Sequence, residues 1–143
     1  KFSAVEKFKN ETNIFVAGST WLPDEEFIIQ LHNENLLLGY KWIIAPHQIT
    51  AGRIKELLKA FGSRAITLTS LNDKHAHYFD VLIVDTIGDL SSLYQFGNIA
   101  YVGGGFNYSV HNILEAAVYG IPIVFGPNHK KSVEAVALLL GQL

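Results

Sequence analysis

The sequence predicts an α/β fold built on a doubly wound parallel sheet of about six strands. Short apolar runs bounded by turn residues recur along the chain, and each run is continuous rather than alternating, as expected for strands that are buried on both faces. Helical patterns lie between most of these runs, which favours parallel strands joined by right-handed crossovers, with helices on both faces. The chain has 143 residues, of which 49% are hydrophobic and 17% charged, and this fits one compact domain with one core.

The expected elements follow one another in a regular order. We expect strands at 14–18, 41–46, 65–69, 81–85, 99–103 and 121–126. We expect helices at about 24–34, 50–61, 89–96, 112–119 and 131–140. Gly62 and Gly120 stand directly after two of these helices, where glycine commonly ends a helix. The segment 70–80 is expected to be an exposed loop.

Composition excludes several classes of protein. The net charge is −2, and no basic cluster is larger than the pair Lys130 and Lys131, so we expect no nucleic-acid partner. The absence of cysteine excludes disulfide scaffolds, thiolate zinc sites and thiol nucleophiles. No apolar run approaches about 18 residues and the first residues lack the apolar core of a signal peptide, so we expect a soluble chain. Because the chain begins without Met and stops in an apolar helical pattern, we expect it to be a piece of a longer protein.

The segment YVGGGFNYSVHNILEAAVYG is the strongest sign of a ligand site. Gly103, Gly104 and Gly105 let the backbone turn sharply and approach a ligand. The helix expected to begin near Asn112 presents unpaired N–H groups and a partial positive charge, which suit phosphate or carboxylate. Glu115, in its first turn, is placed to accept hydrogen bonds from hydroxyls such as those of a ribose. On this segment alone, an ordinary strand, glycine turn and helix with a solvated glutamate is an equally open alternative.

Further candidates stand beyond the C-terminal ends of the strands, where such sheets bind their ligands. The hydroxyls of Ser19 and Thr20 can bind phosphate or carboxylate oxygens, or equally cap the next helix. The acidic run 24–26 complements the positive end of that helix and would repel an anion directly over it. An anion in this part of the site would therefore have to sit at the 18–20 loop.

Two other strand ends carry residues suited to a nucleoside. His47 follows Pro46, whose ring adds an apolar surface for a base, although an exposed or capping histidine is an alternative. Arg53 either reaches the same edge or decorates its helix, and the second reading is favoured. In the segment DTIGDL, Asp89 is the expected N-cap of a helix. That segment still permits contact between a nucleoside and the backbone around Ile87.

Other chemistries are poorly supported. His75 and His77 could share one face of a strand, but no third ligand is close in sequence, and we reject a zinc site. His111 can point at the ligand or only close the loop. The lysine pair can neutralise an anionic sugar, although a solvated helix start is the more common meaning of such a pair. No Ser-His-Asp or paired-carboxylate arrangement stands out, and Glu115 is more typical of a carboxylate that holds a ribose than of a general base.

The motifs occur in a specific order along the chain. They are GSTW at 18–21, IIAPH at 43–47, VDTIGDLSSLY at 84–94, YVGGGF at 101–106, HNILEAAVYGIPIVFGPNHKK at 111–131 and EA at 134–135. Together they closely resemble the 3-deoxy-D-manno-octulosonic acid (Kdo) transferases of lipid A biosynthesis. The resemblance spans nearly the whole chain and is to the C-terminal, donor-binding half of that family's two-domain GT-B fold, a Rossmann-like domain. It implies that residues 1–143 are a nucleotide-sugar (CMP-Kdo) binding domain cut from a larger two-domain protein.

The resemblance implies a transferase that moves Kdo from CMP-Kdo to a lipid A precursor in lipopolysaccharide biosynthesis, without a metal or other cofactor. Carried over residue by residue, the ribose is bound by Glu115, the phosphate region by Asn112, and the cytidine by Pro46, His47 and Ile87. The donor carries one phosphate and one carboxylate. The glycine loop and the Ser19 and Thr20 hydroxyls are expected to hold these two anions and to stabilise the charge that develops on departing CMP.

The resemblance also places the catalytic base, a carboxylate, in an N-terminal half that docks the lipid and the membrane. We therefore expect this chain to hold no catalytic residue, to bind CMP weakly and to transfer nothing. The parent protein is expected at the cytoplasmic face of the bacterial inner membrane. The chain departs from many members by having no basic residue between Pro46 and His47, and by carrying Asn107-Tyr108-Ser109 in the next loop. Two alternatives stay open: a UDP-sugar-dependent GT-B transferase or epimerase, and a non-catalytic nucleotide-binding domain.

Overall fold

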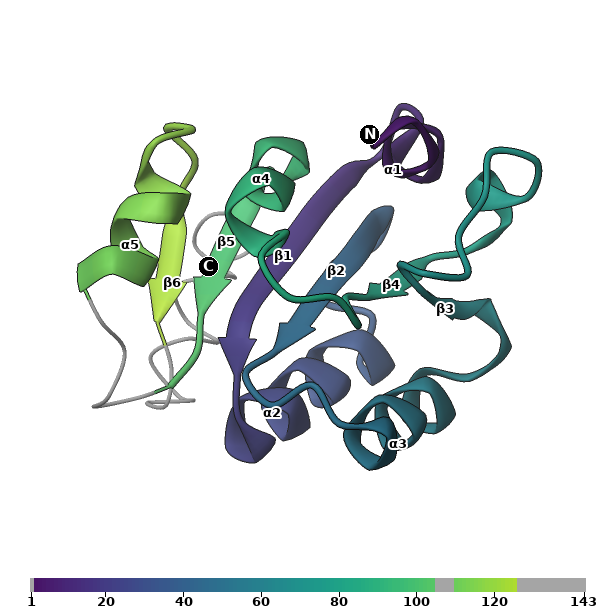
Figure 1. The fold of residues 1–143 in the computed structure, drawn as a ribbon, viewed down its shortest axis with the longest axis horizontal. Coiled ribbons are helices and arrows are strands. Elements are labelled where there is room, and N and C mark those ends of the chain that lie inside the picture. The colour runs from purple at the N-terminus through teal and green to yellow at the C-terminus, as the bar shows by residue number, and fades with distance from the viewer. Residues whose placement is uncertain (1, 105–109, 126–143) are drawn as a thin grey trace.

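The computed structural model describes residues 2–104 and 110–125. In these residues, six parallel strands form one sheet in the order β3-β4-β2-β1-β5-β6 (Figure 1). The strands are β1 (Asn13–Thr20), β2 (Tyr40–Pro46), β3 (Ala65–Thr67), β4 (Val81–Ile83), β5 (Ile99–Val102) and β6 (Ile123–Phe125). The predicted parallel sheet of about six strands is therefore confirmed, and each strand overlaps the apolar run that predicted it.

The helices also fall where the helical patterns lie. They are α1 (Ser3–Lys9), α2 (Leu22–Asn33), α3 (Ala51–Phe61), α4 (Leu90–Leu93) and α5 (Val110–Ala117), with short 3-10 turns η1 (Gly62–Arg64), η2 (Ala76–Tyr78) and η3 (Tyr94–Phe96). The sequence patterns did not predict α1, and η2 lies within the segment expected to be a loop. Gly62 ends α3 with φ 86°, as predicted. The helix expected at 131–140 lies outside the described residues.

Helices cover both faces of the sheet, so the fold is doubly wound. On one face, α2 and α3 contribute Phe27, Ile28, Leu31, Ile54, Leu57 and Phe61 to a buried cluster with the strands. On the other face, α1, η2, α4, η3 and α5 contribute Val5, Phe8, Ala76, Leu93, Tyr94 and Ala116. Successive residues of the central strands alternate between the two clusters, which is why these strands read as continuous apolar runs.

The strand order brings the candidate residues to one edge. Because the strands are parallel, their C-terminal ends point the same way, as the arrowheads of β1, β2 and β5 show in Figure 1. The chain passes from β1 to its neighbour β2 on one side, whereas β5 leads to β6 on the other side. The boundary between β1 and β5 is thus a topological switch point, the place where open α/β sheets bind ligands.

The opposite end of the sheet is held by a buried lysine. Lys41, at the start of β2, donates hydrogen bonds from Nζ to the carbonyl oxygens of Phe8 (2.7 Å) and His77 (3.1 Å). Burial lowers the pKa of this amine. The contacts attach α1 and η2 to the centre of the sheet, at the end opposite the C-terminal ends of the strands.

Candidate functional site

The candidate site is built on the ends of β1 and β5. The N–H of Gly103 donates to the carbonyl oxygen of Gly18 (2.9 Å), which extends the pairing of the two strands by one residue. Beyond this point β1 is irregular: Ser19 has φ 53°, and the register with β2 shifts between Gly18 and Thr20. The bulge turns the chain out of the sheet and into the start of α2 at this edge.

A buried carboxylate joins the two sides of the switch point. Asp24 Oδ2 accepts the N–H of Trp21 (2.9 Å), which caps α2, and also the N–H of Gly104 (3.0 Å). Asp24 Oδ1 accepts the hydroxyl of Tyr101 (2.6 Å). Asp24 is 2% exposed. The carboxylate that was expected only to complement the helix start therefore also fixes the glycine loop.

The described glycines of the loop do not offer free amides. The N–H groups of Gly103 and Gly104 are both engaged within the protein. A Cβ atom on Gly103 would lie 2.6 Å from Asp24 Oδ2 and 2.8 Å from the Ser19 carbonyl oxygen, so only glycine fits there. Gly105, the third glycine of the motif, lies outside the described residues.

Tyr101 makes the hydrogen-bond network of Asp24, which joins α2 to the glycine loop, dependent on pH. Burial, the hydrogen bond to Asp24 and the charge of that carboxylate raise the pKa of the Tyr101 hydroxyl above its ordinary value of 10.0. The stability that the neutral hydroxyl contributes is therefore fully present below pH 10 and is lost as the pH rises, because the unfolded tyrosine ionises before the folded one.

Urea unfolding of the wild type and of Tyr101→Phe between about pH 8 and pH 11 tests this account. The stability advantage of the wild type is expected to shrink by about 1.4 kcal/mol per pH unit above about pH 10. Parallel stability curves for the two proteins would show that Tyr101 titrates normally in the folded state.

On the β2 side, an ion-paired network lines a pocket. The buried Thr20 hydroxyl donates to Glu25 Oε2 (2.8 Å), and Arg53 forms an ion pair with Glu25 and a second one with Glu56 at 2.5 Å. The pocket measures 230 Å³ and is lined by Thr20, Trp21, Leu22, Glu25, Pro46, Gln48 and Arg53. Arg53 thus lies at the strand ends, and the favoured interpretation that it only decorates its helix was wrong.

Trp21, the last residue of the GSTW motif, lies beside the candidate site, although it was not itself expected to take part in it. Its ring stacks on the imidazole of His47, with centroids 4.3 Å apart and planes inclined by 21°. The N–H of His47 donates to the Thr20 carbonyl oxygen (2.8 Å), so the ends of β1 and β2 are tied together beside the stack. A large aromatic residue directly after a strand end, outside any apolar periodicity and 39% exposed, is the signal that could have identified it.

The segment after β4 forms the turn that was predicted. Asp85 accepts the N–H (3.1 Å) and the hydroxyl (2.5 Å) of Thr69, and Gly88 has φ 89°. Asp89 stands at the N-cap position of α4, but it accepts the Thr86 hydroxyl (2.7 Å) rather than a helix N–H. Ile87, at the tip of the turn, is 90% exposed.

An open groove lies between this turn and α3. It measures 410 Å³ and is lined by Ile49, Thr50, Ala51, Ile54, Lys55, Leu58 and Asp85. Its walls are mainly aliphatic, and its polar residues are Thr50 and Lys55 on the α3 side and Asp85 after β4.

On the β5 side, α5 begins earlier than expected. The helix starts at Val110, so Asn112 lies inside it rather than at its cap, and Glu115 lies in the second turn rather than the first. Val110 and His111 supply helical residues ahead of the asparagine, whose cap preference suggested the later start. Glu115 is partly buried, and its charge helps to raise the pKa of Tyr94, although burial of Tyr94 is the larger cause.

The described residues contain neither a metal-binding cluster nor a membrane-spanning helix. No three histidine, aspartate or glutamate side chains among them are grouped so that they could hold a metal ion. None of their helices combines the length and the apolar character needed to cross a membrane. Lys130 and Lys131 lie outside the described ranges.

The fold and the site together define a doubly wound, Rossmann-like α/β domain, with its polar edge at the switch point of the sheet. No protein-family model matches the chain. It is 36% identical over 129 residues to the 3-deoxy-D-manno-octulosonic acid transferase of Aquifex aeolicus, covering 87% of this chain and 34% of that protein. It is 30% identical over 139 residues to the enzyme of the same name from Rickettsia typhi, covering 94% of this chain and 29% of that protein.

A glycosyltransferase of another name is also similar: the bifunctional glycosyltransferase/methyltransferase of Fusobacterium nucleatum is 32% identical over 136 residues, covering 88% of this chain and 21% of that protein. Among solved structures, the C-terminal CMP-Kdo binding domain of WaaA from Acinetobacter baumannii has a TM-score of 0.66 and 19% identity, covering 96% of this chain and 73% of that one. This likeness confirms the predicted fold class.

The chain is a relative of the 3-deoxy-D-manno-octulosonic acid transferases, and the resemblance predicted from its motifs is confirmed. It spans about a third of the length of the curated transferases that it matches.

Proposed function

We propose that the chain is the donor-binding domain of a glycosyltransferase that transfers Kdo from CMP-Kdo to a lipid A precursor. The observation that carries this proposal is the strand order, which sets the ends of β4, β2, β1 and β5 in one row with α5 following β5. Every motif that resembles the Kdo transferases and lies in the described residues occurs in this row. The names of the similar transferases and the fold of the CMP-Kdo binding domain support the same reading.

The cytidine is assigned to the β2 and β4 ends. Pro46 ends β2 and His47 follows it, while Ile87 follows the adjacent β4. The groove beside α3 offers aliphatic walls for the flat faces of a base. Exposed backbone around Ile87 can hydrogen-bond the edge of the base. The Trp21 ring supports the His47 imidazole from the β1 side, which fixes one wall of this site.

The phosphate and the sugar carboxylate are assigned to the β1 and β5 ends. A helix N-terminus attracts anions, and α5 is the next described element after β5 and the glycine motif. We assign Asn112 and Gly105 to the phosphate region, Ser19 to the anionic groups, and Glu115 to the ribose hydroxyls. Thr20 is assigned an indirect role below the anionic groups, because its hydroxyl already donates a hydrogen bond to Glu25. Gly103 lets the ends of β1 and β5 pack closely, and the amides of Gly103 and Gly104 are not assigned to the anions, since both are engaged.

The transfer step itself is assigned to a longer protein that includes this domain. Residues 1–143 match about a third of the curated transferases, and no residue here is proposed as the catalytic base. We therefore infer that this domain alone binds nucleotide and transfers no sugar. Contact with the lipid acceptor and location at the inner membrane stay predictions from the resemblance.

Isothermal titration calorimetry with CMP and UDP tests the proposal. We expect CMP to bind at least about tenfold more tightly than UDP, because the two nucleotides differ in the base edge and in phosphate number. Glu115→Ala is expected to weaken CMP binding by about tenfold through loss of a charged hydrogen-bond acceptor. Tighter binding of UDP would refute the Kdo assignment and favour a UDP-sugar enzyme.

A further inference from the structure

A buried tyrosine hydroxyl next to the switch point has no partner in the described part of the chain. Tyr94 lies in η3 with an exposed fraction of 0%, and its hydroxyl makes no hydrogen bond there. An unsatisfied buried hydroxyl destabilises a fold, and phenylalanine would fill the same space without that penalty. The hydroxyl therefore has no structural use in the state that the structure describes.

The hydroxyl lies over the end of β1. A Cβ atom on Gly18 would stand 2.0 Å from Tyr94 Oη and 2.9 Å from the ring carbon that carries it. The residue after Gly18 is Ser19, at the bulge that opens the site. Only glycine at position 18 lets the phenol reach this far toward the ligand-binding edge.

Tyr94 lies on the sheet face that is also covered by α5, the helix that carries Glu115. Tyr94 and Ala116, the neighbour of Glu115 in α5, belong to one buried cluster on this face of the sheet. Burial and then the Glu115 charge raise the pKa of Tyr94, so its hydroxyl keeps its proton at neutral pH. Tyr94 is therefore a buried hydrogen-bond donor on the same face of the sheet as the Glu115 helix.

We propose that Tyr94 is a positioning residue for Glu115, and that its hydroxyl donates a hydrogen bond to the Glu115 carboxylate when the ribose of the nucleotide is bound. This inference rests on the proposed function, because it assigns the Glu115 carboxylate to the ribose hydroxyls. The bond would fix the carboxylate in the orientation that accepts those hydroxyls and would satisfy the buried phenol at the same time.

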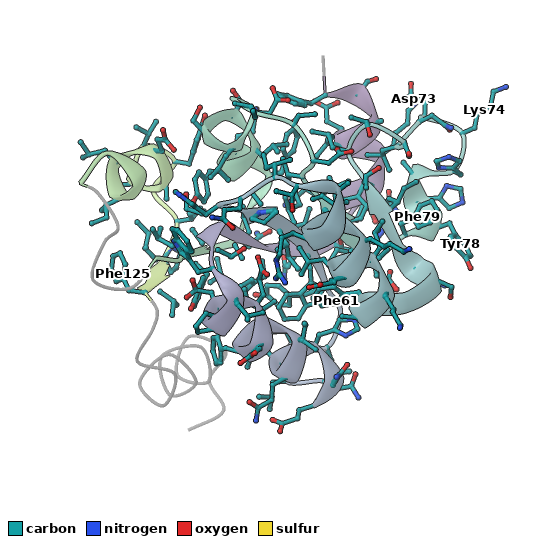
Figure 2. The ribbon with its side chains drawn as sticks, turned by 60° about the horizontal axis from the view of Figure 1, so that its bottom comes forward. Phe61, Asp73, Lys74, Tyr78, Phe79 and Phe125 are labelled. Atoms are coloured by element: carbon teal, nitrogen blue, oxygen red, sulfur yellow. The ribbon has the colours of Figure 1, made fainter. Side chains whose placement is uncertain are left out.

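The test measures the preference for CMP over dCMP, which lacks the ribose 2′-hydroxyl. By calorimetry, the wild type is expected to bind CMP about tenfold more tightly than dCMP, and Tyr94→Phe to reduce this preference to about twofold. Tyr78→Phe is the matched control and is expected to keep the full preference. Tyr78 is in η2, on the opposite side of the molecule from Phe125 and β6 (Figure 2).

The outcomes separate this inference from the proposed function. A Tyr94→Phe protein that keeps the wild-type preference, with thermal unfolding confirming its fold, overturns the role of Tyr94 while the CMP site stands. A wild type that binds neither nucleotide overturns the proposed function and this inference with it. In the Glu115→Ala background, adding Tyr94→Phe is expected to cause no further loss of preference, and a further loss would show that Tyr94 acts independently of Glu115.

Discussion

Replacing Asp24 by alanine is expected to lower the free energy of unfolding by about 3 kcal/mol. The substitution removes the cap of α2 and leaves the Tyr101 hydroxyl and the Gly104 N–H without their acceptor, in a place where water has little access. The loop after β5 loses its attachment to α2, so CMP binding is expected to weaken by at least about tenfold as well. Urea unfolding and calorimetry at neutral pH measure the two effects.

Glu26 provides the matched control for Asp24. It is an acidic residue in the same turn of α2, but it is exposed. Glu26→Ala is expected to change stability by less than about 0.5 kcal/mol and to leave CMP binding unchanged. If Asp24→Ala were as stable as Glu26→Ala, the carboxylate would not be the brace that joins α2 to the glycine loop.

Replacing Gly103 by alanine is expected to destabilise the protein by about 3 kcal/mol and to abolish detectable CMP binding. The new methyl group would lie 2.6 Å from Asp24 Oδ2, 2.8 Å from the Ser19 carbonyl oxygen and 2.9 Å from the Thr20 Cα. Two of these contacts are with backbone, which cannot move aside as a flexible side chain can. The ends of β1 and β5 must then separate, which distorts both sides of the proposed site.

Gly52→Ala is the control for this substitution, because no atom lies within 4 Å of the added Cβ and Gly52 belongs to the first turn of α3. It is expected to be neutral or to stabilise the protein by up to about 1 kcal/mol, since alanine favours the helix. Differential scanning calorimetry of both variants measures the contrast. Equal melting temperatures for the Gly103 and Gly52 variants would mean that the strand ends tolerate separation.

The sheet could be predicted from sequence because its central strands are buried on both faces. β1, β2 and β5 each read as an uninterrupted apolar run, and their alternation with helical patterns is typical of parallel topology. Short or marginal elements were less visible. The seven residues of α1 are held by packing of Val5 and Phe8 on the sheet rather than by a strong local pattern. The start of α5 was misplaced because a polar residue suggested a cap that the helix does not use there.

Residues at strand ends could also be predicted, because parallel strands place their C-terminal ends together whatever the details of packing. The network of side-chain contacts between these strand ends could not be predicted. Asp24 contacts Tyr101 and Gly104, which are 77 and 80 residues away, and no local pattern encodes such a contact. No local pattern encodes the stacking of Trp21 on His47 or the ion pair of Arg53 with Glu25 either. Both contacts depend on how α2 and α3 pack beside the strand ends.

A crystal structure of the protein with CMP tests the central claim most directly. We expect the nucleotide along the C-terminal edge of the sheet, with its base between His47 and Ile87, its ribose on Glu115 and its phosphate at the start of α5. Nucleotide density at any other surface of the protein, in particular at the Lys41 end of the sheet, would contradict the assignment of the β1/β5 switch point as the donor site.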